Sequence, residues 1–204
     1  MNFLTSRINR ISPSITLKMT AKAAELRRLG KPVFNMSVGE PDFSTPENIQ
    51  QAGIFAIQNG HTKYTPGSGM LDLKQAVCKK LKRDNNLEYS PNNIIVSCGG
   101  KHSLYNACQT LFEKNDEVII FTPYWVSFPD FVSVTGANPI IVKTNPDSQY
   151  EPDFDDLSKK ITKQTKGIII NSPSNPTGGV WSDSAIKKII DISESNDLWL
   201  FSDE

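Results

Sequence analysis

The stretch TKGIIINSPSNPTGGV, residues 165–180, decides the fold. Its apolar run Gly167–Ile170 is typical of a strand in a parallel sheet that is covered on both faces. The prolines and glycines that follow predict a loop with an unusual backbone path, and the X–Pro bonds at Pro173 and Pro176 are candidates for the cis form. The stretch therefore predicts a buried strand that ends in a shaped polar loop.

Four further apolar runs along the chain also predict strands. Helical patterns with apolar stripes separate most of these runs, for example around Leu104–Leu111 and Ile186–Ile190. Alternation of strands and helices implies parallel crossovers, and hence a layered α/β fold. The four further predicted strands are Ile94–Cys98, Val118–Phe121, Pro139–Val142 and Leu198–Phe201.

The N-terminal part of the chain predicts helices joined by turns. Apolar residues at helical spacing predict helices over Pro13–Leu29, Glu47–Gln58 and Met70–Arg83. Phe34–Val38 predicts a short strand. Later in the chain, Asn145–Lys166 is polar and charged, which favours a solvated loop and a surface helix.

Composition excludes several classes of protein. Lys plus Arg and Asp plus Glu are 22 each, so no basic excess favours nucleic acid. The three cysteines form no C-x-x-C pair and the histidines number two, which argues against a metal site and favours reduced thiols in a cytoplasmic protein. No apolar run reaches the length of a membrane span, so no membrane partner is expected.

Residues that follow the predicted strands are interpreted together, because open parallel sheets bind ligands at the carboxyl ends of their strands. Gly99, Gly100 and Lys101 precede a helix, where glycines and a helix N-terminus favour an anion, although a plain tight turn is the more common reason for such a pattern. Trp125 follows the next strand and could stack on an aromatic ligand, although a lone aromatic residue more often packs in the core.

The last two strand ends carry Asn175 and Asp203. Asn175 can present its amide to a ligand oxygen. The carboxylate of Asp203 suits a protonated pyridine nitrogen, and a helix N-cap is the plainer alternative. An anion cradle, a stacking face, an amide and a ring-nitrogen partner on one edge of one sheet describe a pyridoxal 5'-phosphate site.

The sequence closely resembles the class I aminotransferases of fold type I, in particular the bacterial aspartate aminotransferase subgroup. The resemblance covers nearly the whole chain in the right order, and NSPSNPTG with a PYWVS segment upstream is highly specific. The matching stretches are SRINRISPSITLKMTAKAAEL, GEPDFSTPENI, TKYTPGSGM, IIVSCGGKHSLYNA, DEVIIFTPYWVSFPD, TKGIIINSPSNPTGGV and LFSDE.

The resemblance implies a fold type I transferase whose large domain is a three-layer αβα sandwich. Residues 1–45 would form the N-terminal arm and part of the small domain, and residues 46–204 an incomplete cofactor-binding large domain. The C-terminal half of the family is absent. In the family's sheet order, strands from later in the sequence lie between Ile94–Cys98 and Gly167–Ile170, so this chain would lack interior strands. The N-terminal segment has the composition of a transit peptide, but it also matches the start of the mature family, so we expect a cytoplasmic protein.

The resemblance also assigns six residues to the cofactor, five of them in the same subunit and the sixth, Tyr64, in the neighbouring one. Gly100 and Lys101 would lie at its phosphate, and Trp125 would stack on its pyridine ring. Asn175 would bond the phenolic oxygen, and Asp203 would pair with the ring nitrogen. This last pair would keep the ring protonated, so that it accepts electrons as the substrate Cα–H bond breaks.

Further residues would serve the substrate and a second subunit. Gly39 would bind the α-carboxylate region of the substrate, whose pocket Trp125 and Asn175 would help to line. Tyr64 would reach the phosphate in the neighbouring subunit, so the family implies a homodimer.

The implied reaction transfers an amino group between an L-amino acid, with aspartate favoured, and 2-oxoglutarate. In the family the Schiff-base lysine follows the aspartate at some distance, so it is expected beyond Glu204. Lys159 is not a candidate, because it precedes the Asn175 motif and lies in a charged stretch. We therefore expect this chain alone to be inactive. A noncatalytic degenerate fragment, another pyridoxal phosphate activity on the same fold and a plain anion-binding module stay open as alternatives. The sequence also leaves open whether aspartate, prephenate or another dicarboxylic acid is preferred.

Overall fold

A computed structural model describes residues 4–11, 13–36 and 39–204 of the chain. The chain divides into two compact units. The first comprises Met1–Ser12 and Ser97–Glu204, and the second comprises Pro13–Val96.

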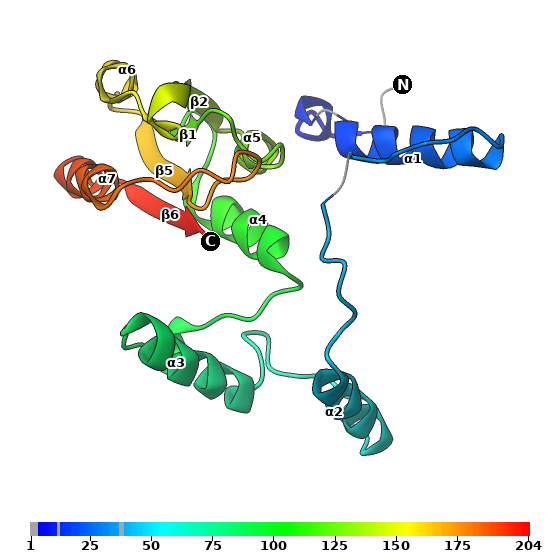
Figure 1. Cartoon of the computed structure of the whole chain (residues 1–204). Coiled ribbons are helices and arrows are strands. Elements are labelled where there is room, and N and C mark those ends of the chain that lie inside the picture. The colour runs from blue at the N-terminus through cyan, green and yellow to red at the C-terminus, as the bar shows by residue number, and fades with distance from the viewer. Residues whose placement is uncertain (1–3, 12, 37–38) are drawn as a thin grey trace. The chain divides into compact units, whose positions relative to one another are not determined.

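The first unit contains a four-stranded sheet in the order β2-β1-β5-β6 (Figure 1). All three ladders are parallel, so the carboxyl ends of the four strands lie along one edge. This confirms four of the five strands predicted from apolar runs. The strands are β1 (Glu117–Phe121), β2 (Asn138–Val142), β5 (Thr165–Asn171) and β6 (Trp199–Asp203).

Helices cover both faces of this sheet, because successive strand residues point to opposite sides. Ile120 and Ile169 pack in one buried cluster with residues of α4 (Gly100–Leu111) and α5 (Phe128–Thr135). Ile119 and Ile168 pack in a second cluster with residues of α6 (Phe154–Lys160) and α7 (Asp183–Ser195). The layers are therefore αβα, as the family resemblance implied.

A short hairpin follows β2 and leads into α6. It consists of β3 (Thr144–Asn145), a 3-10 turn η3 (Pro146–Ser148) and β4 (Glu151–Pro152), with β3 and β4 antiparallel. Asp153 caps α6 by accepting hydrogen bonds from the amides of Asp155 and Asp156 at 3.0 and 2.9 Å. The stretch predicted as a solvated loop and a surface helix therefore contains the helix α6, and a short hairpin stands in place of a plain loop.

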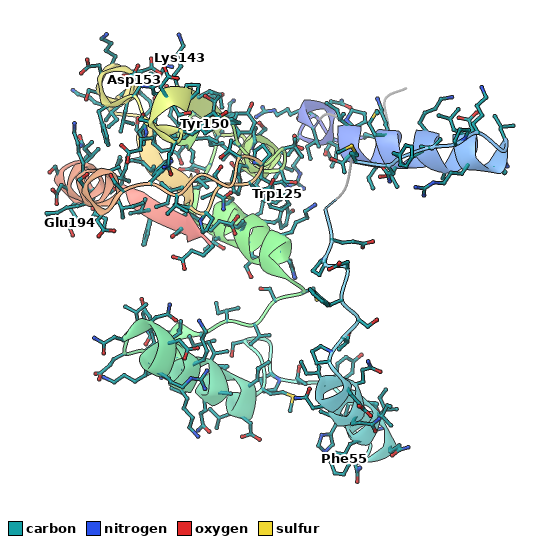
Figure 2. All side chains as sticks on the ribbon, in the orientation of Figure 1. Phe55, Trp125, Lys143, Tyr150, Asp153 and Glu194 are labelled. Carbon is teal, nitrogen blue, oxygen red and sulfur yellow. The ribbon has the colours of Figure 1, made fainter. Side chains whose placement is uncertain are left out.

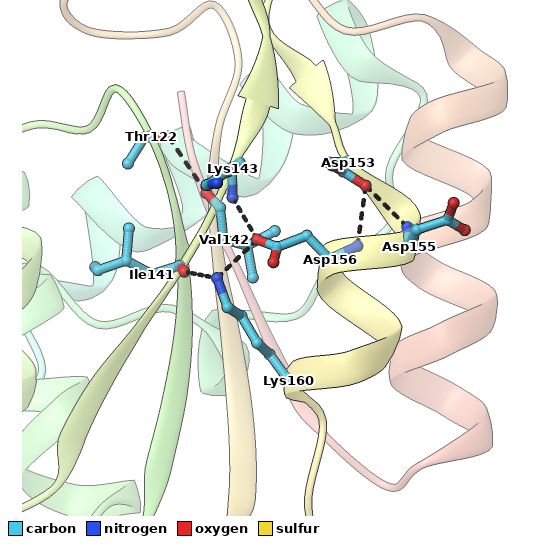
Figure 3. Close-up of polar contacts among 8 residues, drawn as sticks. All are labelled: Thr122, Ile141, Val142, Lys143, Asp153, Asp155, Asp156 and Lys160. Carbon is cyan, nitrogen blue, oxygen red and sulfur yellow. Dashed lines mark hydrogen bonds and ion pairs between the residues drawn. The ribbon is translucent and has the colours of Figure 1, made fainter.

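Polar contacts fix the end of β2 against α6 (Figure 3). The Lys160 ammonium donates to the Ile141 carbonyl oxygen at 2.6 Å and to Asp156 Oδ2 at 2.7 Å. The same carboxylate oxygen accepts a hydrogen bond from the main-chain amide of Lys143 at 2.9 Å. Asp156 and Lys160 of α6 thereby bind the main chain at the carboxyl end of β2.

Helices of the second unit match their predicted positions. They are α1 (Ile15–Arg28), α2 (Glu47–Gln58) and α3 (Leu71–Asn85), followed by the 3-10 turn η2 (Pro91–Asn93). Ser14 caps α1 through a hydrogen bond from the amide of Leu17 at 3.3 Å. Another 3-10 turn, η1 (Ile8–Arg10), belongs to the first unit. Within the described residues, no helix combines the length and apolar character that a membrane crossing requires.

One predicted strand does not form, and the described residues of a second lack regular structure. Residues 94–98 have no strand assignment, although Ile94 has an extended backbone with φ −110° and ψ 130°. A strand needs a neighbouring strand for its hydrogen bonds, whereas the amide of Val96 bonds the Ser68 carbonyl oxygen at 3.0 Å. For the prediction at Phe34–Val38, residues 34–36 lack regular structure, and residues 37–38 lie outside the described part of the chain.

Candidate cofactor site

An open helix N-terminus lies at the start of α4. Gly99 precedes the helix with φ +85°, a conformation that favours glycine, and no side chain caps the helix. Among the described residues, the amides of Gly100 and Lys101 have no hydrogen-bond acceptor. A Cβ at Gly100 would meet nothing within 4 Å. Free amides, open space and the helix dipole are the features that bind a phosphate.

Trp125 lies on the loop from β1 to α5 and is labelled in Figure 2. Its ring makes edge contacts with Phe128 and Phe131, at centroid distances of 5.5 and 5.8 Å. The Lys101 ammonium lies 4.9 Å from the centroid of the Trp125 ring. The indole therefore packs on the core, as the plainer interpretation expected, and also contacts the lysine that the resemblance places at the phosphate.

The loop after β5 is fixed by its own polar groups. Asn171 Oδ1 accepts a hydrogen bond from the Asn175 amide at 2.6 Å, and the Ser174 amide bonds the Gly179 carbonyl oxygen at 2.8 Å. The peptide bonds preceding Pro173 and Pro176 are cis, as suggested from the sequence. The Thr122–Pro123 bond before Trp125 is cis as well, which was not predicted from the sequence.

The hairpin formed by β3 and β4 packs against the loop that follows β5. The indole nitrogen of Trp181 donates to the Tyr150 carbonyl oxygen at 2.8 Å, and its ring makes an edge contact with Phe121 at 5.1 Å. Gly179 is required here, because a Cβ would lie 2.7 Å from the Gln149 carbonyl oxygen. The side chain of Asn175 stays exposed at the end of this braced loop.

Asp203 ends β6 and is half-buried. The Asn171 side-chain amide donates to the main-chain oxygen of Asp203 at 2.8 Å and lies 3.5 Å from Asp203 Oδ2. Burial raises the pKa of the Asp203 carboxyl. Across the described part of the chain, no cationic side chain forms an ion pair with this carboxylate. A half-buried carboxylate without a cation suits a protonated ring nitrogen.

Asn171, Asp203 and Trp125 lie on one face of the sheet as well as at its carboxyl edge. Asn171 is two residues from Ile169, which packs with α4 and α5, so both side chains point to that face. Phe201 packs against the same cluster, and Asp203 follows it by two residues. The Trp125 ring contacts this cluster too.

Gly39 and Tyr64 belong to the second unit. Both are exposed, and a Cβ at Gly39 would meet nothing within 4 Å. Their roles at the substrate and at a neighbouring phosphate stay predictions. In the first unit, sequence reasoning missed Asn171, which contacts both Asn175 and Asp203. The signal that could have found Asn171 is its place at the end of the strand next to β6.

A family model described as aminotransferase class I and II matches residues 31–204. The chain belongs to this family. Relatives include the aspartate aminotransferase of Bacillus sp. strain YM-2, 46% identical over 201 residues that make up 98% of this chain and 51% of the relative. The aspartate/prephenate aminotransferase of Thermus thermophilus is 39% identical over 204 residues, which are 100% of this chain and 53% of that protein.

Solved aminotransferases share the fold. An aspartate aminotransferase from Thermus thermophilus with maleate superposes with a TM-score of 0.96 at 39% identity, covering 100% of this chain and 53% of that one. An alanine aminotransferase from Pyrococcus furiosus gives a TM-score of 0.93 at 27% identity, covering 98% of this chain and 52% of that one. The chain thus has the fold of the type I aminotransferases and spans about half the length of the curated relatives that it matches.

Class I aminotransferases depend on pyridoxal 5'-phosphate, and the residues at this edge of the sheet fit that group. The phosphate needs donors, which the amides of Gly100 and Lys101 offer in open space. The pyridinium nitrogen needs an acceptor, which Asp203 offers on the same face of the sheet.

Proposed function

We propose that this chain binds pyridoxal 5'-phosphate at the carboxyl edge of its sheet and forms the N-terminal half of an aspartate aminotransferase-like site. One observation carries the proposal: the half-buried carboxylate of Asp203 has no ion-pair partner among the described residues and lies at the carboxyl edge of the sheet, where Lys101 in the first turn of α4 contacts Trp125. An anion at the helix and a cation at Asp203 match the two charged ends of the cofactor.

Each group of the chain would have a separate task. The amides at the start of α4 and the Lys101 ammonium would hold the phosphate, and Trp125 would cover the ring and exclude water. Asn175 would donate its amide to the phenolic oxygen. Asp203 would hold a proton on the ring nitrogen. When bound, the cofactor supplies an electron sink for the carbanion formed at the substrate Cα.

The proposed substrates are an L-amino acid, aspartate first, and 2-oxoglutarate. Names of the relatives support this choice, since several are aspartate or aspartate/prephenate aminotransferases. Gly39, Trp125 and Asn175 would contact the substrate, and Tyr64 would reach the phosphate of a second subunit in a cytoplasmic homodimer. The imine-forming lysine is expected beyond Glu204, so residues 1–204 alone should bind the cofactor without covalent attachment and without catalysis.

Titration of the 204-residue chain with pyridoxal 5'-phosphate tests the proposal. We expect reversible binding that quenches tryptophan fluorescence, and Asp203→Ala should weaken it roughly tenfold, because a charge-assisted hydrogen bond is lost. Asp191→Ala is the matched control, since Asp191 pairs with Lys187 on the exposed side of α7. Equal affinity in the wild type and Asp203→Ala would refute the site.

Borohydride treatment of the same mixture tests the expectation about the lysine. Reduction should leave no single lysine stoichiometrically labelled, because no specific imine is expected within residues 1–204. Stoichiometric labelling of one lysine, located by peptide mass, would contradict that expectation while leaving cofactor binding intact.

A further inference from the structure

We propose that Asn171 is a positioning residue of the site, whose carboxamide fixes the Asn175 loop against the end of β6 and so sets the spacing between Asn175 and Asp203. The inference rests on the proposed function, in which those two residues contact the cofactor. Asn171 itself would touch neither the cofactor nor the substrate, and it would act through its two neighbours.

The geometry uses both ends of the carboxamide. Asn171 Oδ1 accepts from the Asn175 amide at 2.6 Å, while Asn171 Nδ2 donates to the Asp203 carbonyl oxygen at 2.8 Å. Asn171 and Asp203 are also partners in the ladder between β5 and β6. Strand register and the Asn171 side chain thus both fix the position of Asp203 relative to Asn171.

These two contacts demand the chemistry of a short amide. A carboxamide presents an acceptor and a donor on one planar group, whereas a carboxylate presents acceptors alone. Asn171→Asp therefore keeps the shape and the acceptor for Asn175 but removes the donor to Asp203. Asn171→Ala removes both contacts. Comparison of the two variants therefore separates the effect of the contact with Asn175 from the effect of the contact with Asp203.

The contacts of Asn171 also fix the position of the loop that carries Asn175, although the tip of this loop is exposed. Asn175 is exposed, and its side chain has no hydrogen-bond partner among the described residues. Its main chain is nevertheless tied through Asn171 to β6, which is itself paired with β5 in the sheet. A cofactor that spans Asn175 and Asp203 would meet a preset spacing, which reduces the entropy lost on binding.

The test uses nuclear magnetic resonance of the ligand-free 204-residue chain. In Asn171→Ala, hydrogen exchange of the Asn175 amide should accelerate roughly tenfold, because its acceptor is gone. In Asn171→Asp, that amide should stay protected. The carbonyl ¹³C resonance of Asp203 should shift upfield in both variants, because both lack the donor. The control Asn138→Asp makes the same change at the start of β2, which is not adjacent to β5 or β6, and should move neither signal.

Unchanged signals of Asn175 and Asp203 in Asn171→Ala would overturn the proposal. A uniform change across all amides of β5 and β6 would also overturn it, because that pattern indicates general loosening and not positioning. If Asn171→Ala does not fold, the split expected for Asn171→Asp decides alone: a protected Asn175 amide with a shifted Asp203 carbonyl supports the link, and any other pattern refutes it.

Binding of pyridoxamine 5'-phosphate separates this inference from the proposed function. It cannot form an imine with lysine, so it reports the noncovalent site alone. We expect Asn171→Ala and Asn171→Asp each to weaken its affinity roughly tenfold, from the loss of one or two hydrogen bonds. Failure of the wild-type chain to bind would refute the proposed function, while the ligand-free signals would still decide the link. Wild-type binding with unchanged affinity in both variants would refute the positioning role.

Discussion

Gly167 leaves the space that the ring of Phe112 occupies: a Cβ at position 167 would lie 2.6 Å from Phe112 Cζ. The same Cβ would lie 3.2 Å from the main-chain oxygen of Trp199 on the adjacent strand. Phe112 also contacts the Phe201 ring, with centroids 5.4 Å apart. Phe112, the residue after α4, therefore packs on β5 near the start of β6, at a position that admits no side chain.

Gly167→Ala should destabilise the protein by about 1–3 kcal/mol, because added atoms in a packed core force neighbouring groups to shift. Urea unfolding followed by circular dichroism measures the loss. The matched control is Gly53→Ala within α2, where a Cβ would meet nothing within 4 Å and where alanine should add about 0.5–1 kcal/mol of helix stability. A Gly167→Ala protein as stable as the wild type would show that α4 does not pack as described.

Lys160→Met should lower the melting temperature more than Lys187→Met. Lys160 bonds both Asp156 and the Ile141 carbonyl oxygen, and its side chain is 33% exposed. Lys187 pairs with Asp191 on the surface, with side chains 74% and 55% exposed, and such pairs contribute little. Equal melting temperatures for the two variants would contradict the contacts drawn in Figure 3.

The contribution of Lys160 should also depend on pH. Its hydrogen bond is the main cause that lowers the pKa of Asp156, and the amide of Lys143 adds to the effect. A depressed carboxyl pKa stabilises the native state above the pKa of the unfolded chain, and the benefit is lost as pH falls through the folded value. The gap in melting temperature between wild type and Lys160→Met should therefore narrow in acid. A gap that widens in acid would be inconsistent with this ion pair.

Asp203→Asn should raise the stability of the ligand-free protein near pH 7. Burial raises the pKa of Asp203, so the native state disfavours the charged form and loses stability as pH rises through the unfolded and then the folded pKa. An amide removes this penalty. The gain should vanish below the unperturbed aspartate pKa of about 3.9, where the carboxyl is neutral in both states. Melting curves across pH check it, and a destabilised variant at pH 7 would contradict it.

The three cysteines should react in a fixed order. Burial raises the pKa of the Cys108 thiol to about 12, and Cys108 is 0% exposed, so it should stay unreactive until the protein unfolds. Cys98 is exposed and should react first with a disulfide reagent, and Cys78 is intermediate. Thiol counting with and without urea, with modified peptides located by mass, checks the order. Rapid native-state labelling of Cys108 would indicate that the core around α4 is open.

Apolar patterns correctly predicted those helices and strands whose formation depends mainly on burying one face. Four strands and the helices α1, α2, α3, α4 and α7 appear at their expected places, because runs such as Ile168–Ile170 and caps such as Ser14 act locally, whereas α5 was not predicted. Ile94–Cys98 has the same apolar character, yet it forms no strand, because a strand also needs a partner and periodicity carries no information about neighbours.

Site residues could likewise be predicted only where local sequence was sufficient. Gly100, Trp125 and Asp203 could be proposed because each follows or precedes a recognisable element. Asn171 could not be proposed, because its contacts with Asn175 and Asp203 depend on the order and register of β5 and β6. Exposed apolar residues of α2, such as Phe55 in Figure 2, likewise gave no signal that distinguishes them from core residues.

The central claim is that separate loops at one edge of the sheet hold one cofactor, and chemical-shift mapping tests it most directly. The 204-residue chain would be titrated with pyridoxamine 5'-phosphate and followed by amide and indole resonances. We predict saturable shifts, with one common dissociation constant, at Gly100, Lys101, the Trp125 indole, Asn175 and Asp203. Shifts confined to the opposite edge of the sheet, for example at Lys114 and Asn138, or no saturable shifts at all, would contradict the account.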